Sequence, residues 1–260
     1  MPRRDEGRIT LSQAAAVTGL IADLRARIAE AADPERAPQM QAYMKSAMPF
    51  RGVSAVPLRR ICRAVLDAHR LADRASWERA VSTLWDEAAF REERYAAIAL
   101  SGHRYYRELQ DAGTLELYHH LVVTGAWWDL VDDVAIHRVG PILRADPTRV
   151  GPVVRAWARD EDLWVRRTAI LCQRASKAAT DTDLLADVLT ANLEGTLHGH
   201  EFFIRKAVGW ALREYARTDP DWVLAYVDAH AGELSGLSRR EALKHLTPPA
   251  CGDAEGPARS

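Results

Sequence analysis

The segment with the clearest potential for chemistry is Trp127-Trp128-Asp129-Leu130-Val131-Asp132. If this segment is helical, Trp128 and Asp132 lie four residues apart on one side of the helix. The face of an aromatic ring attracts a cation, and a carboxylate beside the ring adds a negative charge. The spacing therefore predicts a site for a positively charged group. The competing interpretation is that Trp128 packs between helices and that Asp132 pairs with an arginine.

Two later segments combine aromatic and basic residues. The first begins with Trp164-Val165-Arg166-Arg167. A helical wheel places Arg167 and Arg174, seven residues apart, away from the apolar side of this helix. The resulting stripe could hold consecutive phosphates or could simply be solvated. In the segment 199–217, Trp210 falls opposite the apolar face. It shares that side with Lys206, Arg213 and Arg217. An indole among cations is typical of contact with a nucleic-acid backbone or a sugar.

The elements that must position these residues are helices, because apolar residues return every three or four positions almost everywhere. The predicted segments are 10–30, 35–47, 55–70, 76–88, 90–108, 113–124, 127–145, 147–159, 163–177, 182–194, 199–217, 220–231 and 237–246. Breaks coincide with cap and proline chemistry at Asp33-Pro34, Asp146-Pro147, Thr180-Asp181 and Asp219-Pro220. The sequence predicts an all-α fold.

A weak internal repeat suggests how these helices are arranged. The tetrapeptides that begin at Arg94, Arg166 and Arg205 can be overlaid, and their starts are 72 and 39 residues apart. Halving the first interval places a fourth equivalent helix at Leu130, so the repeat is roughly 35–40 residues long, as in helix-pair solenoids. We therefore predict an α-α superhelix of HEAT-like repeats in which equivalent helices line one concave surface. Its single domain spans 9–247, between flexible ends at 1–8 and 248–260.

Composition limits the function classes. The chain has 260 residues, 48% of them hydrophobic, and a net charge of -1, so a phosphate-binding surface requires segregation of its 35 basic residues. The three cysteines form no C-x-x-C pair, and no signal peptide or long apolar run is present, which together favour a cytoplasmic protein. The histidine clusters His119-His120 and His198-Gly199-His200 lack further ligands at metal-site spacing, so no metal or cofactor is expected.

Five segments, in this order along the chain, resemble the AlkD-type DNA alkylation repair family, which consists of alkylpurine DNA glycosylases built of HEAT-like repeats. They are Tyr43-Met44-Lys45 with Pro49-Phe50, the Trp127 to Asp132 segment, Trp164-x-x-Arg167-x-Ala169-Ile170-Leu171, the segment from Phe202 to Tyr215, and the segment from Ser238 to His245. The resemblance covers roughly residues 35–246. Arg51 and Met48 depart from the expected pattern, as does a longer N-terminal extension, which affects the expected lesion preference more than the chemistry.

The resemblance implies a role for individual residues. Trp128 and Trp210 resemble the tryptophans that cradle the damaged nucleotide, Asp132 resembles the catalytic carboxylate, and Arg167 resembles an arginine facing the DNA backbone. Further DNA contacts are expected from a set of cleft-bordering or basic side chains: Tyr43, Lys45, Arg166, Arg174, Lys206 and Arg213. The implied activity is hydrolysis of the N-glycosyl bond of N3- and N7-alkylated purines in double-stranded DNA, in base excision repair, without drawing the lesion into a pocket.

The proposed chemistry needs a single carboxylate. An alkylated purine carries a positive charge and leaves readily, so Asp132 has only to stabilise the developing cationic sugar and orient water. A monomer is expected, because the cleft must admit a duplex. The alternatives are a non-catalytic HEAT-repeat scaffold that binds DNA or protein, which has no need for a carboxylate among phosphate-binding residues, and a metal-dependent hydrolase.

Overall fold

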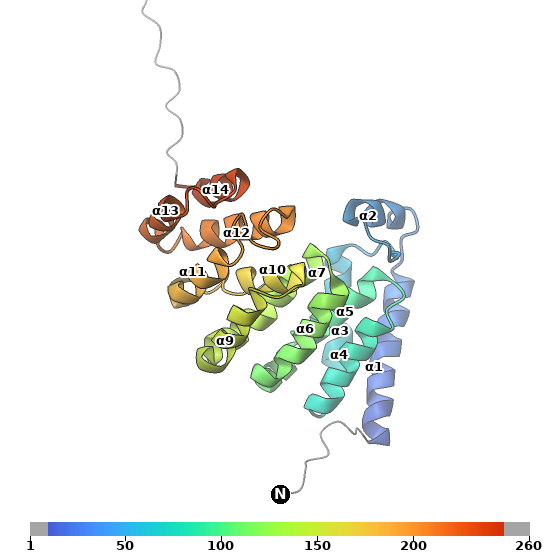
Figure 1. Cartoon of the computed structure of the whole chain (residues 1–260). Coiled ribbons are helices and arrows are strands. Elements are labelled where there is room, and N and C mark those ends of the chain that lie inside the picture. The colour runs from blue at the N-terminus through green and yellow to red at the C-terminus, as the bar shows by residue number, and fades with distance from the viewer. Residues whose placement is uncertain (1–9, 247–260) are drawn as a thin grey trace, which may run out of the picture. The chain divides into compact units, whose positions relative to one another are not determined.

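The computed structural model describes residues 10–246, and every regular element within that range is a helix (Figure 1). These residues form two compact units that meet between Arg138 and Val139. The first unit contains α1 (Leu11–Glu30), α2 (Ala37–Met44), α3 (Ala55–Ala68), α4 (Arg74–Asp86), α5 (Arg91–Ser101), α6 (Leu115–Gly125) and α7 (Trp128–Val134). The second unit contains α8 (Gly140–Ala145), α9 (Pro147–Trp157), α10 (Leu163–Leu171), α11 (Thr182–Thr190), α12 (Phe202–Tyr215), α13 (Pro220–Ala229) and α14 (Gly236–Leu243). The all-α prediction is confirmed.

Helix starts follow the predicted cap residues. Asp146, Asp181 and Asp219 each accept a hydrogen bond from a backbone N–H in the first turn of the helix that follows. Asp33 instead closes a turn, because its carboxylate accepts from the backbone N–H of Arg36, and α2 begins only at residue 37. Three of the four predicted breaks are thus helix caps, and the fourth is a turn that precedes its helix.

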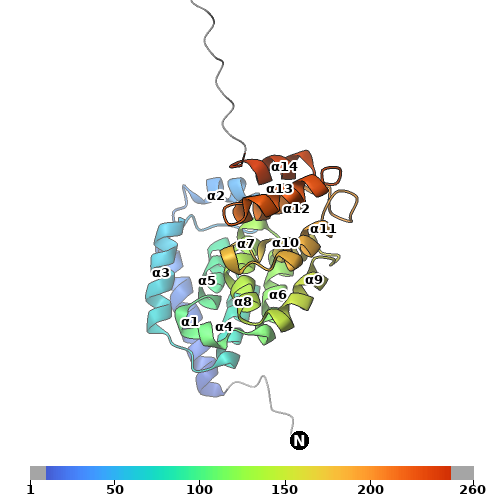
Figure 2. The same ribbon diagram turned by 90° about the vertical axis from the view of Figure 1, so that its left-hand side faces the viewer.

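Within the first unit, the helices form two rows. Figure 1 shows α4 between α1 and α6, and Figure 2 shows α5 between α3 and α7, in agreement with the helix contacts. The loop before α3 is fixed by the buried carboxylate of Glu92, which accepts from the backbone N–H groups of Arg51, Gly52 and Val53 at 3.0, 2.9 and 3.1 Å. These bonds satisfy loop donors that have no helical partner.

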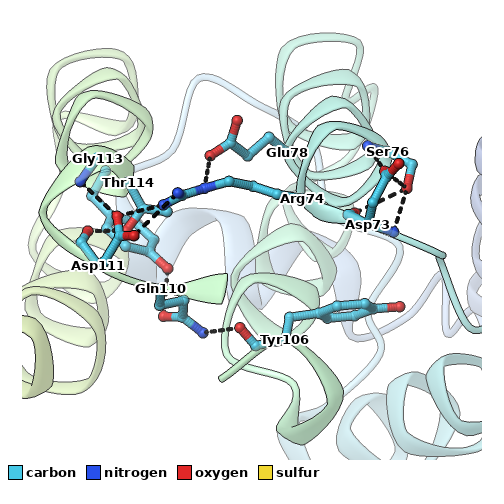
Figure 3. Close-up of polar contacts among 10 residues, drawn as sticks. Asp73, Arg74, Ser76, Glu78, Tyr106, Gln110, Asp111, Gly113 and Thr114 are labelled. Atoms are coloured by element: carbon cyan, nitrogen blue, oxygen red, sulfur yellow. Dashed lines mark hydrogen bonds and ion pairs between the residues drawn. The ribbon is translucent and has the colours of Figure 1, made fainter. Parts of the chain in front are cut away.

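A second link in the first unit joins α4 to the turn before α6 (Figure 3). The guanidinium of Arg74 donates to both carboxylate oxygens of Asp111, at 2.6 and 3.2 Å, and to Glu78 one turn along α4 at 3.1 Å. Asp111 also accepts from the backbone N–H of Gly113, so it fixes the turn from which α6 begins. A bidentate arginine–carboxylate pair gives this connection a defined geometry.

Within the second unit, α12 lies between α10 and α14 (Figure 1). The approach of α12 to α14 requires a glycine at residue 209. A Cβ atom there would lie 2.6 Å from the Cβ of Glu241 and 3.0 Å from the backbone oxygen of Ser238. The two helices are therefore packed more closely than a side chain at residue 209 would permit.

The predicted repeat interval is found between successive helices that carry the aromatic and basic segments. Helices α5, α7, α10 and α12 begin at residues 91, 128, 163 and 202, so their starts are 37, 35 and 39 residues apart. The single domain over residues 9–247 stays a prediction, and the proposed flexible ends at 1–8 and 248–260 lie outside the described residues.

The cores of both units are apolar, and they include two buried cysteines. Burial raises the pKa of Cys62 and of Cys172 to about 12, so both thiols stay protonated and unreactive at neutral pH. Cys251 lies outside the described residues. No helix between residues 10 and 246 combines the length and the apolar character needed to cross a membrane.

Candidate nucleic-acid and catalytic site

Helix α7 presents the predicted aromatic and acidic pair in the first unit. Trp128 is its first residue and Asp132 follows one turn later, and both side chains are half-buried. Leu130, Val131 and Val134 are buried on the other side, as the helical wheel predicts. Trp127 lies just outside the helix in extended conformation and is half-buried. The helix thus leaves Trp128 and Asp132 partly accessible.

The first turn of α7 is held by Asp129, a residue that the sequence interpretation passed over. One of its carboxylate oxygens accepts from the guanidinium of Arg91 at 2.5 Å, and the other accepts from the Tyr95 hydroxyl at 2.6 Å. The side chains of Arg91 and Asp129 are 6% and 10% exposed, which makes this a buried ion pair. Burial and the Asp129 charge raise the pKa of Tyr95, so its hydroxyl remains a donor. Asp129 therefore orients the turn that carries Trp128.

Two predicted DNA-contact residues lie at the end of α2. The Tyr43 side chain is 78% exposed, and it borders a cavity of about 500 Å³ together with Tyr95 and Asp133. Lys45 is exposed and caps the helix in the left-handed conformation, at a φ of 49°. Both side chains are therefore accessible from solvent.

In the second unit, three cations surround the ring of Trp210. The guanidinium carbons of Arg167 and Arg174 lie 5.5 and 5.6 Å from the ring centroid, and the Lys206 ammonium lies 5.8 Å from it. Trp210 is half-buried, while Ile204 and other apolar residues of α12 face the core as predicted. Trp210 and Lys206 therefore lie away from the apolar face of α12, as the helical wheel predicts. The structure shows that Arg167 of α10 and Arg174 of the turn after α10 also lie beside the Trp210 ring.

Arg167 differs from the predicted exposed stripe, because its side chain is packed inside the protein at 1% exposure. Its guanidinium donates to the backbone oxygen of Phe203 and lies 5.9 Å from the Phe203 ring. Arg174, seven residues further along the chain, is only half-buried. The two arginines share the Trp210 ring but not a common solvated face.

Lys206 and Arg213, both predicted to contact DNA, are joined by Glu241 of α14. The ammonium of Lys206 donates to one carboxylate oxygen of Glu241 at 2.7 Å, and Arg213 donates to the other at 2.6 Å. The hydrogen bond from Lys206, with the charges of both partners, lowers the pKa of Glu241. One positive charge of the pair is thus neutralised and the other remains.

Arg166, also predicted to contact DNA, has a structural role in this geometry. It is 6% exposed, and its guanidinium donates to the backbone oxygens of Asp160, Arg159 and Ala191. These carbonyls follow helices and have no helical donor, so Arg166 completes their hydrogen bonding. A guanidinium committed to such groups has few donors for a phosphate, and we therefore remove Arg166 from the DNA-contact set.

The histidine clusters have ordinary protein contacts. His120 pairs with Asp86 at 2.7 Å, His198 lies 2.8 Å from the backbone oxygen of Glu161, and His200 pairs with Glu201 at 3.2 Å. Over residues 10–246, no group of three or more His, Cys, Asp or Glu side chains is arranged to hold a metal ion.

Residues 24–246 match the family model described as DNA alkylation repair enzyme. The chain belongs to this family. The match spans α2, α7, α10, α12 and α14, so the helices that carry the candidate site residues lie within the family region. No protein with a curated function matches the chain.

Two solved structures have a similar fold to this member of the DNA alkylation repair family. A predicted DNA alkylation repair enzyme from Enterococcus faecalis is 28% identical with a TM-score of 0.74, over 84% of this chain and 98% of that chain. The Pseudomonas fluorescens alkylpurine DNA glycosylase AlkC, bound to DNA containing an abasic site analog, is 17% identical with a TM-score of 0.50. That likeness covers 89% of this chain and 62% of AlkC.

The sequence offered a signal for two of the residues that its interpretation missed. Asp129 belongs to the same six-residue segment as Trp128 and Asp132, but its contact with α5 spans 38 residues of sequence. Glu241 belongs to the last of the segments that carry the family resemblance, although its pairing with α12 depends on the close approach at Gly209. The roles of Asp129 and Glu241 can be recognised only when the position of the neighbouring helix is known.

Proposed function

We propose that the protein is an AlkD-type alkylpurine DNA glycosylase. It hydrolyses the N-glycosyl bond of N3- and N7-alkylated purines in double-stranded DNA and thereby starts base excision repair. The observation that carries this proposal is the half-buried pair of Trp128 and Asp132, one helical turn apart, in a chain of the DNA alkylation repair family. AlkC, a protein of similar fold, is an alkylpurine glycosylase bound to DNA, which supports the same reaction class.

The reaction requires little acid catalysis. Alkylation at N3 or N7 gives the purine a positive charge, so the base leaves without first being protonated. The barrier then lies in forming a cationic, oxocarbenium-like deoxyribose. Asp132 stabilises this cation through its negative charge and orients the attacking water, whose proton it accepts.

Trp128 acts on the same cation through the face of its indole, which attracts the sugar more strongly as positive charge develops. Because the first turn of α7 is fixed by Asp129, the indole is held in place before the substrate binds. A preorganised ring and carboxylate have little reorganisation to undergo during the reaction. The chemistry does not depend on drawing the base into a closed pocket, so excision proceeds without base flipping.

The DNA backbone is bound by the remaining predicted residues. Trp210, with Arg174 and Lys206 beside its ring, offers an aromatic surface and positive charge to the sugar-phosphate chain. Arg167, which is buried against the same ring, adds its positive charge from within the protein. Tyr43 and Lys45 at the end of α2 and Arg213 beside Lys206 supply further contacts. Such contacts position the duplex and carry no sequence preference. The protein acts as a monomer.

The proposal is tested by incubating the purified protein with methylated duplex DNA in the absence of added metal. We expect release of free 7-methylguanine and 3-methyladenine, measured by chromatography, and a matching number of abasic sites. An unmethylated duplex of the same sequence serves as the control and yields no base. Tight binding of the methylated duplex without release of either base would instead identify a non-catalytic DNA-binding scaffold.

A further inference from the structure

A second basic site lies in the first unit, at the end of α2 and beside the starts of α5 and α7. It is an open cavity of about 570 Å³. Its lining comes from three turns of the chain: Lys45, Ser46, Ala47, Met48 and Pro49, then Ala88, Ala89, Arg91 and Arg94, and then Gly125, Ala126 and Trp127. Three of these side chains are basic and none is acidic, in a protein whose net charge is -1. The lining therefore has an excess of positive charge.

The positive charge of this cavity is only partly balanced within the protein. Arg91 pairs with Asp129, whereas Lys45 and Arg94 have no salt bridge to any described residue. Arg94 donates to the backbone oxygen of Thr124 at 2.9 Å and lies 4.8 Å from the Trp85 ring. Burial, and then the nearby charge of Arg91, lower the pKa of Arg94. The charge of Asp86 acts on Arg94 in the opposite direction but forms no salt bridge with it, so Lys45 and Arg94 keep positive charge that an anion can balance.

The guanidinium groups also have unused donors. The Nε atoms of Arg91 and Arg94 are covered by protein and have no hydrogen-bond partner among the described residues. Arg91 as a whole is 5% exposed. Because both Nε atoms are covered by protein, they are not contacts for a ligand in the open cavity. What the cavity offers an anion is the positive charge of the side chains that line it.

The turns that line the cavity are held in unusual conformations. Lys45 and Ala126 have φ values of 49° and 41°, in the left-handed region that favours glycine. The loop after Lys45 is anchored to α5, because the backbone oxygen of Pro49 accepts from the backbone N–H of Arg91 at 2.9 Å. The Ser46 hydroxyl further fixes this loop by accepting from the backbone N–H of Met48 at 3.1 Å. Strained but anchored turns of this kind are often found at functional sites.

We propose that this cavity binds one phosphate of a DNA backbone, with Lys45 and Arg94 as its charged contacts and Arg91 as a supporting donor. The inference rests on the proposed function for the identity of the anion, since the duplex supplies the phosphate. The half-buried indole of Trp127 forms an apolar wall of the same cavity, suited to the adjoining deoxyribose. Arg94 is thereby a DNA-binding residue that the sequence alone did not single out.

The test uses the salt dependence of duplex binding by the full-length protein. Each phosphate contact contributes a slope of about -0.9 to the plot of log affinity against log salt, so losing one contact reduces the loss of affinity between about 50 and 200 mM salt by about 3.5-fold. We expect this reduction for Lys45→Gln and for Arg94→Gln. Arg94→Lys keeps the charge and should retain the wild-type slope even if it lowers the unfolding temperature.

The matched control is Arg63→Gln, which removes an exposed positive charge of α3 outside this cavity. If Lys45→Gln and Arg94→Gln give the same slope as Arg63→Gln, the phosphate site is wrong. The same conclusion follows if inorganic phosphate binds in the cavity while the duplex slopes of Lys45→Gln and Arg94→Gln equal that of the wild type. The cavity then binds free phosphate and not the DNA backbone. Base release by the wild type is measured in parallel. Release with unchanged slopes overturns only this inference, whereas changed slopes without release overturn only the glycosylase proposal.

Discussion

The two half-buried tryptophans, Trp128 in the first unit and Trp210 in the second, have opposite electrostatic surroundings. Trp128 begins a helix that carries Asp132 one turn later, while the charge of the adjacent Asp129 is balanced by Arg91. Trp210 lies among the positive charges of Arg167, Arg174 and Lys206. The charged neighbours of Trp128 thus favour a cationic group, and those of Trp210 favour an anionic one. Residue type alone does not determine the role of a tryptophan, because its charged neighbours do.

The two units also hold their tryptophans by different means. In the first unit, the buried Arg91–Asp129 pair fixes the start of α7. In the second unit, α12 is held against α14 by the glycine contact at residue 209 and by Glu241, which is shared by two cations. One unit therefore depends on a buried ion pair, and the other on close helix packing with a more exposed ion pair.

The largest effect is expected for Asp129→Asn, which leaves the Arg91 guanidinium buried without a counter-charge. Breaking one side of a buried pair costs about 3–5 kcal/mol, and we expect a loss of unfolding free energy of this size in urea titrations. The comparison variant is Asp187→Asn in the second unit, where the pair with Arg155 is 38% and 50% exposed and its loss should cost less than about 1 kcal/mol. Equal losses in the two variants would show that the Arg91–Asp129 pair has no special role.

A smaller effect is expected for Gly209→Ala in the second unit. The added Cβ would lie 2.6 Å from the Cβ of Glu241 and 3.0 Å from the backbone of Ser238, so α12 and α14 must separate. Overpacking of this kind costs about 1–3 kcal/mol, measurable by chemical unfolding. Gly19→Ala in α1 is the control, because its Cβ would meet nothing within 4 Å and should instead stabilise the helix by about 0.5–1 kcal/mol. A stabilising Gly209→Ala would disprove the close contact.

The smallest effect on stability, about 1–2 kcal/mol, is expected for Glu241→Gln, which weakens two charged hydrogen bonds. The pKa of Glu241 lies below its ordinary value of 4.5 in the folded protein, so its contribution is complete above that value and is lost as the pH falls through the lowered pKa. The stability difference between wild type and variant, measured as a function of pH, should therefore disappear in acid. The variant should also bind DNA more tightly, because Lys206 and Arg213 are freed. A difference that persists in acid would contradict the ion-pair account.

Much of the fold could be predicted from periodicity and caps. Every predicted segment contains a helix, but the segment 127–145 is divided into α7, a π-helix at Ala135–Val139 and α8. Pro141 explains the division, since a proline in a helix interior lacks the N–H donor and clashes with the preceding turn, whereas it is accommodated near a helix start. Pro141 can be read from the sequence, but the apolar periodicity continues across it, and the sequence interpretation therefore predicted one uninterrupted helix.

The sequence could predict only those features of the candidate site that depend on a single helix. The wheel separated Trp128, Asp132 and Trp210 from the apolar faces of their own helices, because 3.6-residue periodicity is a local property. It could not show that Arg167 would be buried or that Arg166 would bind backbone carbonyls, since burial depends on which neighbouring segment covers a side chain. For the same reason, local periodicity could not predict the partners of Asp129 and Glu241, which lie on other helices.

The central claim is that Asp132 provides the catalytic carboxylate, and the most direct test compares Asp132→Asn with Asp133→Asn. Asp133 is the adjacent aspartate on α7, and it pairs with Arg138 at 3.2 Å. The measurement is the single-turnover rate of 7-methylguanine release from a methylated duplex at saturating protein. We predict that Asp132→Asn lowers this rate by about 100-fold or more while duplex affinity is maintained, and that Asp133→Asn remains close to the wild type. Equal release by Asp132→Asn and the wild type would contradict the account.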